Sequence, residues 1–385
     1  MSKFDFDHLP DRRGTQCVKW DSDADAEMLP LWVADMDFMT APCIIEALEK
    51  RVAHGIFGYT HPGAEYYDAV TGWFERRHGW KFKASDILYT TGVVPAVSAC
   101  IKALARPGDG VIIMPPVYTC FFSSIRNNGC RVVECPMLRT EKSYAIDFDE
   151  LENQCRSESN KVLLLCNPHN PGGRVWTHDE LRRVNDICAA NGITVISDEI
   201  HCEIVFKPHR YTPYANVATS AYVICTAPSK AFNTAGLQCA NIVCPDNDMR
   251  AKIDRALNIN ETCDVGPMGV SALVAAYDKG AEWLDACIAY IRENYDYLCG
   301  RIEAMPGGMH VLDLEGTYLA WVEVSALEIP AIWLSDALKR EAHIWFTPGT
   351  EYGWAGEGYM RINLATSRAR LSEALDRLEA WLRNR

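Results

Sequence analysis

Lys230 has the clearest capacity for covalent chemistry in this sequence. It lies in the segment Ser229-Lys230-Ala-Phe-Asn233, directly after an apolar run that predicts a β-strand. A lysine in a lined pocket can lose its proton and form a Schiff base with a carbonyl compound. Most lysines are simply solvated, so this interpretation depends on the polar residues that follow the other expected strands.

Two further segments follow expected strands and could hold a ligand. Gly92, with Val93 and Val94 after it, would begin a helix, and backbone N–H groups at a helix start bind anions such as phosphate. Asn170 lies in a segment with two prolines and two glycines, which impose a rigid turn and so position side chains. Each segment alone could be an ordinary loop, but two charged residues elsewhere in the sequence support a ligand-binding site.

Two charged residues complete the set. Asp198 is expected at the end of a buried strand, where a carboxylate is costly unless it has a cationic partner. Arg361 lies in a strand-like segment near the C-terminus, and a guanidinium suits bidentate binding of a carboxylate. An anion cradle, a lysine, a buried acid and an arginine are the groups needed to hold pyridoxal 5′-phosphate (PLP) and an amino acid. The sequence therefore predicts PLP as cofactor and a small-molecule amino acid as substrate.

Seven short β-branched runs alternate with amphipathic helical patterns through the middle of the chain, and the pattern at 177–190 opens with Thr177-His-Asp-Glu180, a capping-box sequence. Several runs are apolar throughout, as in strands that are covered on both faces. This alternation predicts an α/β domain with a mostly parallel sheet, whose ligand site forms at the carboxyl ends of the strands. The expected strands are residues 87–91, 110–114, 131–135, 161–166, 194–197, 221–226 and 240–244.

The two ends of the chain depart from this alternation. Residues 1 to about 45 are irregular and rich in aromatic and acidic side chains. The C-terminal third carries a strand-like run at 317–324 and helical patterns, which lie at 281–304, 332–341 and 368–382. We therefore expect a large PLP-binding domain over residues 46–280, with a seven-stranded sheet between helices. A smaller α+β domain would comprise residues 281–385, with residues 1–45 as an N-terminal arm packed on it.

The composition excludes several classes of protein. The chain has 385 residues and a net charge of −13, which argues against nucleic acid or an anionic membrane as a partner. Its 16 cysteines form no C-x-x-C pair and often lie in apolar runs, which is typical of buried packing rather than metal binding. No secretory signal and no membrane span are visible, so we expect a cytoplasmic protein without a metal.

Along nearly its whole length the sequence resembles fold-type I PLP enzymes of the aminotransferase class I/II superfamily. The motifs around Asn170, Asp198, Lys230 and Arg361 occur in the order that the family shows. Finer features resemble one branch, the cystathionine β-lyase (C–S lyase) group. These features include Asp11-Arg-Arg-Gly14-Thr15, Lys19-Trp20-Asp21, Leu31-Trp-Val-Ala-Asp35-Met-Asp-Phe38, Phe57-Gly-Tyr59-Thr60 and Asp198-Glu-Ile-His201.

The resemblance implies roles for the residues already singled out. Lys230 would bind PLP covalently and later remove the Cα proton of the substrate. Asp198 would pair with the ring nitrogen, and Tyr118 would stack on the ring, so that these three form the expected catalytic set. Asn170 would bind the 3-oxygen of the ring and contact the substrate, whose carboxylate Arg361 would bind.

The resemblance also implies how the phosphate is held. Backbone amides at a helix start and one serine would bind it: Gly92, Val93, Val94 and Ser229. Tyr59 would reach the phosphate of a neighbouring subunit, which implies a homodimer with shared sites. His201 is expected at the cofactor, where the wider family commonly has tyrosine, and Gln238 replaces a common phosphate-binding arginine.

The branch implies α,β-elimination from L-cystathionine or related cysteine S-conjugates, which yields a thiol, pyruvate and ammonia. Two alternatives stay open. A PLP-dependent aminotransferase of an L-amino acid would use the same lysine, aspartate and arginine, and a PLP-binding regulatory protein would add a surface for a protein partner. Four aromatic residues are candidates for lining the substrate pocket: Trp32, Trp345, Trp354 and Tyr352.

Overall fold

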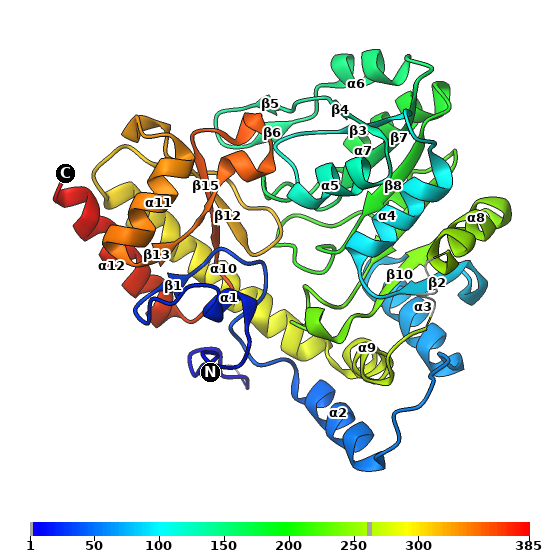
Figure 1. Ribbon diagram of the computed structural model, residues 1–385, viewed down its shortest axis with the longest axis horizontal. Helices are drawn as coiled ribbons and strands as arrows, with labels where there is room; N and C mark the ends of the chain where they lie inside the picture. The colour runs from blue at the N-terminus through cyan, green and yellow to red at the C-terminus, as the bar shows by residue number, and fades with distance from the viewer. Residues whose placement is uncertain (1–2, 260–263) are drawn as a thin grey trace.

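A seven-stranded sheet forms the centre of the protein, as the sequence predicts (Figure 1). The computed structural model describes residues 3–259 and 264–385. Neighbouring strands pair in parallel except β10, which is antiparallel to both of its neighbours. All seven expected strands are present, in the spatial order β2 (Ile87–Thr90), β10 (Ala240–Val243), β9 (Tyr222–Thr226), β8 (Thr194–Asp198), β7 (Asn160–Cys166), β3 (Gly110–Ile113) and β4 (Arg131–Glu134).

Helices cover both faces of this sheet. Val162 and Leu164 of β7 belong to one apolar cluster, and the alternate residues Leu163 and Leu165 belong to the other, so the strand is buried on both sides. The first cluster contains residues of α4 (Val93–Leu104), α5 (Thr119–Asn127) and α8 (Asn247–Asn258). The second contains residues of α3 (Ala64–His78), α6 (Phe148–Cys155), α7 (His178–Ala190) and α9 (Pro267–Lys279).

The α7 helix begins where the sequence places a capping box. The Thr177 hydroxyl accepts a hydrogen bond from the Glu180 N–H (3.2 Å), and the Glu180 carboxylate accepts one from the Thr177 N–H (2.8 Å). These reciprocal bonds satisfy backbone donors that have no partner inside a helix. The predicted start of this helix is confirmed.

The C-terminal part builds a second, smaller unit beside the large sheet (Figure 1). The long helix α10 (Ala281–Ala304) runs into it, and α11 (Ala331–Ala342) and α12 (Arg368–Arg383) pack with it. Its four-stranded sheet has the order β11 (His310–Val311), β12 (Leu319–Glu323), β15 (Tyr359–Asn363) and β14 (Thr347–Pro348).

The N-terminal arm lies against this unit. Its strand β1 (Leu29–Pro30) pairs in parallel with β13 (Ile344–Trp345), although the two elements lie more than 300 residues apart in sequence. The arm also contains a short helix, α1 (Val18–Asp21), within a region that the sequence presents as irregular. The domain boundaries given above stay a prediction.

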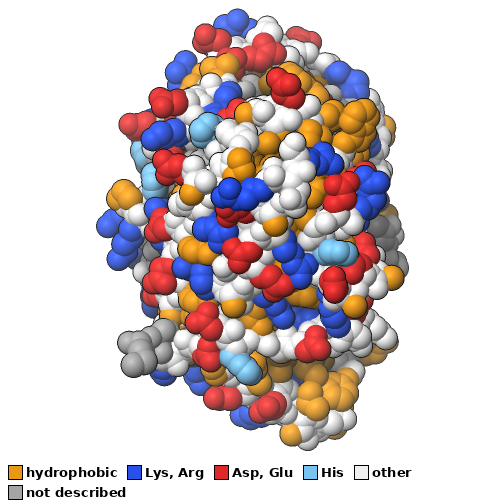
Figure 2. All heavy atoms as spheres, turned by 90° about the vertical axis from the view of Figure 1, so that its left-hand side faces the viewer, with side chains coloured by type: hydrophobic (Ala, Val, Ile, Leu, Met, Phe, Trp, Pro, Cys, Tyr) orange, Lys and Arg blue, Asp and Glu red, His pale blue; other side chains and the backbone are white. Residues whose placement is uncertain are grey.

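The charged side chains on the surface and the state of the cysteines are as the composition indicates. Acidic and basic side chains are interspersed over the face that Figure 2 shows, without one broad patch of either sign. No helix among the described residues is both long and apolar enough to cross a membrane. All 15 cysteines in the described ranges are free thiols, and Cys263 lies outside those ranges.

Candidate active site

A cavity of about 180 Å³ lies at the carboxyl ends of the central strands. Strands β2, β3, β7, β8 and β9 all run in the same direction, so the segments that follow them meet at one edge of the sheet. The cavity brings together nine residues that the sequence singled out: Gly92, Val93, Val94, Tyr118, Asn170, Asp198, His201, Ser229 and Lys230.

Lys230 follows β9 and points its amino group at the N-terminal arm. Its Nζ donates a hydrogen bond to the backbone carbonyl of Ala34 (2.6 Å). Burial of the amino group lowers the pKa of Lys230 to about 8, and the positive charge of Arg361 adds to this effect. Asp35 and Asp198 act in the opposite direction. A lysine with such a pKa can act as a nucleophile and as a base near neutral pH.

Asp198 is the last residue of β8 and is only 3% exposed. Its carboxylate accepts one hydrogen bond, from the backbone N–H of Ile200 (3.1 Å), and forms no ion pair with a described residue. Burial therefore raises the pKa of Asp198 to about 7, and the hydrogen bond from Ile200 and the charge of Lys230 offset this effect only in part. A buried acid in this state favours the binding of a cation beside it.

The neighbouring acid, Glu199, is also fully buried but is supplied with donors. Its carboxylate accepts hydrogen bonds from the hydroxyls of Ser197 and Tyr211, from the side-chain amide of Asn167 and from the Tyr214 N–H. Burial nonetheless raises the pKa of Glu199 to about 7. Glu199 thus holds the loop after β8 in place, and Asp198 is the acid that faces the cavity.

His201 lines the cavity as a neutral imidazole. Burial, together with the charges of Lys230 and Arg361, lowers its pKa well below the ordinary value. Its Nδ1 atom is buried and has no hydrogen-bond partner. An unpartnered polar atom at this depth is costly, so a ligand that bonds to it would remove that cost.

Arg361 lies on β15 of the smaller unit and is not among the residues that line the cavity, but it contacts Asn170, which is. Its guanidinium donates hydrogen bonds to Oδ1 of Asn170 (3.3 Å) and to the carbonyl of Trp32 (2.7 Å). The side chain is 5% exposed and its Nε has no partner, so a donor is left for a ligand. Buried arginines of this kind bind carboxylates through charge-assisted hydrogen bonds.

The remaining predicted residues line the cavity on the side of the large unit. Gly92 is the N-cap residue of α4 and provides no side chain to cap it, so the Val93 and Val94 amides at the helix start are placed for an anion. Tyr118 is the N-cap residue of α5, and burial raises its pKa well above the ordinary range, so its hydroxyl stays protonated.

This set of groups fits PLP. The cavity offers amides for a phosphate, an unpaired buried acid for a protonated ring nitrogen and an amine for an aldehyde. The unpartnered Nδ1 of His201 supplies one more polar group beside them. These groups do not form hydrogen bonds or ion pairs with one another. Polar groups left without such partners are expected at a site where a bound ligand supplies them.

Other predicted residues lie outside the cavity lining. Tyr59 is fully exposed, on the connection between α2 (Pro42–His54) and α3. Trp32 stacks on Trp345 (ring centroids 4.2 Å apart), and Trp354 is 68% exposed. These three tryptophans are not among the residues that line the cavity, and neither is Tyr352, whose ring lies 5.0 Å from the Arg361 guanidinium.

Sequence reasoning missed several residues that line the cavity. The cysteines were assigned to packing alone, yet Cys166 and Cys239 also line the cavity. The Cys166 thiol accepts a hydrogen bond from the backbone N–H of Asn170 (3.4 Å). Ala34 was missed because it acts through its backbone, although the motif that contains it belongs to those shared with the C–S lyase branch.

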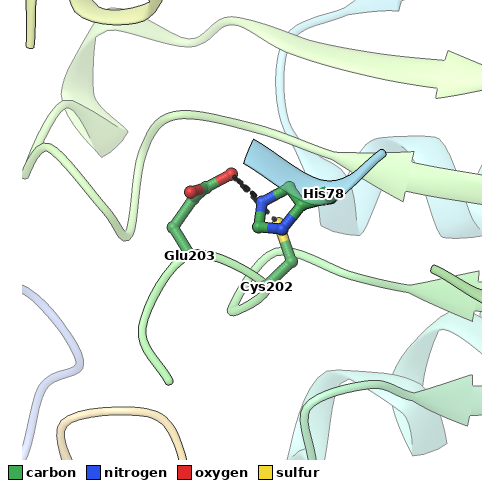
Figure 3. Close-up of side chains that lie close together, drawn as sticks. All are labelled: His78, Cys202 and Glu203. Carbon is green, nitrogen blue, oxygen red and sulfur yellow. Dashed lines mark hydrogen bonds and ion pairs between the residues drawn. The ribbon is translucent and has the colours of Figure 1, made fainter. Parts of the chain in front are cut away.

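A second cluster of ligand-type side chains, none of which lines this cavity, is shown in Figure 3. His78, Cys202 and Glu203 bring one ligand atom each to within 4.8 Å of one another. The Glu203 carboxylate, however, already accepts hydrogen bonds from Trp73 (2.6 Å), Arg77 (3.0 Å) and His78 (2.8 Å). Burial opposes its ionisation, but these donors outweigh burial and lower the pKa of Glu203. The cluster is a satisfied ion-pair network rather than a vacant metal site.

Comparison with known proteins identifies the family. The model of the family "Aminotransferase class I and II" matches residues 26–378. The chain belongs to this family. Its fold-type I architecture and its PLP dependence, both predicted from the sequence, are confirmed at the level of the family.

This aminotransferase-family chain is similar to named lyases over its full length. It is 40% identical to the cystathionine β-lyase PatB of Bacillus subtilis over 384 residues, which covers 98% of this chain and 99% of PatB. The crystal structure of cystalysin from Treponema denticola, which contains PLP, matches with a TM-score of 0.96 and 34% identity over 99% of each chain. The PLP-bound C–S lyase of Staphylococcus hominis matches with a TM-score of 0.92 and 30% identity over 98% of this chain and 99% of the lyase.

Proposed function

We propose that this chain is a PLP-dependent C–S lyase that cleaves L-cystathionine or related cysteine S-conjugates by α,β-elimination. The observation that carries the proposal is the full-length similarity to cystathionine β-lyase and C–S lyase proteins, at 30–40% identity. The cavity supports it because Lys230, Asp198 and Asn170 line it and Arg361 donates a hydrogen bond to Asn170.

The site would hold the cofactor and substrate through separate groups. The amides of Val93 and Val94, with Ser229, would bind the phosphate, and Asp198 would keep a proton on the ring nitrogen. When bound, PLP supplies an electron sink for the pair of electrons left at Cα. Asn170 and Tyr118 would orient the ring between them.

Two residues of this chain would then act on the substrate. Arg361 binds the α-carboxylate, which fixes the Cα–H bond relative to Lys230. The amino group of Lys230 removes the Cα proton, since its lowered pKa leaves a useful fraction unprotonated near neutral pH. The C–S bond at Cβ breaks and the thiolate leaves. The 2-aminoacrylate that remains reacts with water to give pyruvate and ammonia.

The experiment supplies L-cystathionine to the PLP-loaded enzyme and measures pyruvate, with a parallel assay for amino transfer to a 2-oxo acid. Lys230→Ala is the control, because it removes the amine. We expect pyruvate with homocysteine and no requirement for a 2-oxo acid. Amino transfer without pyruvate would instead make the chain an aminotransferase, and binding of PLP with neither reaction would favour a regulatory role.

We further propose a homodimer in which Tyr59 contributes to the site of the neighbouring subunit. Tyr59 is fully exposed, and Ile56 and Phe57 beside it are 64% and 56% exposed. Such a run of exposed apolar side chains suits an interface with a second copy of the chain. The free thiols of the described cysteines are compatible with the cytoplasmic location that we propose.

A mixture of two inactive variants tests the shared site. Tyr59→Ala and Lys230→Ala subunits, refolded together, would form hybrids with one intact site. Activity should then return to about a quarter of the wild-type value, since half of the dimers are hybrids with one of two sites intact. No recovery would mean that Tyr59 acts within its own subunit or not at all.

A further inference from the structure

The segment of residues 31–38, here called the strap, is the part of the N-terminal arm that lies beside the cavity. Ala34 in its middle lines the cavity. The strap contains no helix or strand, so its backbone groups need partners from elsewhere in the protein. Those partners are side chains of the active site and its surroundings.

Side chains of the site and of β15 donate hydrogen bonds to four successive carbonyls of the strap. Arg361 donates to the Trp32 carbonyl (2.7 Å), and Lys230 donates to the Ala34 carbonyl (2.6 Å). The side-chain amide of Asn363 donates to two carbonyls, those of Val33 and Asp35, at 2.6 Å each. Asn363 therefore binds the strap at the residues on either side of Ala34.

The position of Asn363 follows from the geometry of β15. Successive side chains of a strand point to opposite faces, so Arg361 and Asn363, two residues apart, share one face. That face lies against the strap, where the backbone N–H of Asn363 also donates to the Leu31 carbonyl (3.0 Å). Asn363 is completely buried, and its Oδ1 accepts from the Ala365 N–H (2.8 Å), which fixes the orientation of the amide.

We propose that Asn363 is a positioning residue for Lys230: its two bonds to the strap hold the Ala34 carbonyl where that oxygen accepts a hydrogen bond from the lysine amino group. One N–H fixed on a rigid carbonyl restricts rotation about the Cε–Nζ bond and so directs the amine lone pair. The same carbonyl favours the protonated amine, because a hydrogen bond to the charged form stabilises it. The inference rests on the proposed role of Lys230.

Several charged and polar groups act on the same amino group and must be held constant in any test. Arg361 disfavours the protonated form, whereas Asp35, Asp198 and Cys120 favour it. Tyr318 donates its hydroxyl hydrogen to the Ala34 carbonyl (2.8 Å) and so shares that acceptor with Lys230. Asn363 is uncharged, so its replacement leaves the number of charges around Lys230 unchanged.

The test compares Asn363→Ala with a matched control, Asn294→Ala. Asn294 is also completely buried, and its amide also donates to two backbone carbonyls, those of Leu364 (3.0 Å) and Thr366 (2.8 Å), but its side chain forms no hydrogen bond with the strap and does not line the cavity. The readout is the pH dependence of Lys230 acetylation by acetic anhydride in cofactor-free protein, followed by peptide mass spectrometry. The acid limb of kcat for the PLP-loaded enzyme is measured in parallel.

Asn363→Ala should shift the midpoint of Lys230 acetylation downward by about one pH unit, since a hydrogen bond to a charged group is lost. The acid limb of kcat should shift in the same direction, and Asn294→Ala should shift neither. If Asn363→Ala does not fold, Tyr318→Phe replaces it. Loss of the competing hydroxyl should move the midpoint upward, because the carbonyl is no longer shared.

An unchanged midpoint in the folded Asn363→Ala variant would overturn the proposal, as would equal shifts in Asn363→Ala and Asn294→Ala. If only Tyr318→Phe folds, a downward or absent shift has the same meaning. The acetylation readout does not require turnover. A wild-type protein that fails to release pyruvate would therefore refute the proposed lyase function and leave this test intact.

Discussion

Two buried aspartates, Asp37 in the N-terminal arm and Asp198 in the cavity, are equally hidden from water but differ in their partners. Asp37 is 2% exposed and Asp198 is 3% exposed. The carboxylate of Asp37 contacts Lys19 (3.0 Å), Arg12 (3.0 Å) and the indole N–H of Trp20 (2.9 Å). The carboxylate of Asp198 accepts one backbone hydrogen bond and has no cation beside it.

The difference appears in the pKa of each group. Burial opposes the ionisation of Asp37, but Lys19 and the hydrogen bonds to the carboxylate outweigh burial and lower its pKa. At Asp198 the effect of burial exceeds that of the hydrogen bond and nearby charge that favour ionisation, and it raises the pKa to about 7. The arm therefore has its own charges paired, and the cavity keeps one acid for a cation that the chain does not supply. A protonated ring nitrogen of PLP is such a cation.

The same substitution at the two sites should have opposite effects on stability. Asp37→Asn leaves Lys19 buried without a full counter-charge, and loss of one member of a buried pair costs about 3–5 kcal/mol. We expect a loss of that size in the free energy of unfolding, measured by urea denaturation at pH 8. A change near zero would mean that the arm does not depend on this ion pair.

Asp198→Asn should stabilise the cofactor-free protein at pH 8 by about 1–3 kcal/mol, because it removes a buried charge that lacks a cation. The measurement is the same denaturation experiment after removal of PLP. Destabilisation of the cofactor-free protein would show that the Asp198 carboxylate, like that of Asp37, is stabilised by a partner within the protein.

The gain from Asp198→Asn should depend on pH. The pKa of Asp198 is about 7 in the folded chain and 3.8 as the ordinary value, so between these values the folded state binds a proton that the unfolded state releases. Stability from this group is then lost as the pH rises from about 4 to about 7 and levels off above. The difference in unfolding free energy between wild type and Asp198→Asn should grow across that window, and Glu199, present in both, cancels. A constant difference from pH 4 to pH 8 would contradict this account.

An exposed ion pair should have the smallest effect on the free energy of unfolding. Lys3 and Glu282 form an ion pair at 2.8 Å, with both side chains more than 60% exposed. Such pairs contribute about 0–1 kcal/mol. Glu282→Gln should therefore change the free energy of unfolding by less than either buried substitution, and an effect as large as that of Asp37→Asn would remove burial as the explanation for the comparison.

The sequence predicted the strands of the main sheet and one capped helix. All seven strands were predicted from short β-branched runs, and α7 begins with the capping box at Thr177. The helices α2, α3, α5, α6, α8 and α9 were missed. Sequence reasoning overlooked the capping aspartates of α6 and α8, Asp147 and Asp246. The helices α2, α3, α5 and α9, by contrast, begin without a capping side chain. Their starts are decided by tertiary packing, which the local sequence does not encode.

The candidate site was predictable where side chains follow strands, and less so where the backbone or a distant segment takes part. Asp198 ends β8 and Lys230 follows β9, and the order of these strands is set by the α/β pattern. The carbonyl of Ala34 carries no residue-type signal, and its contact with Lys230 spans 196 positions in the sequence. The partner surface expected of Tyr59 belongs to a second chain, so one chain leaves it exposed.

The central claim is that the cavity keeps Asp198 unpaired for the ring nitrogen of PLP. Its most direct test is an absorbance titration of PLP into cofactor-free wild-type and Asp198→Asn protein at pH 8. We predict that the substitution weakens PLP binding by about tenfold or more, since a charge-assisted hydrogen bond is lost. Equal affinity of the two proteins for PLP would contradict the claim.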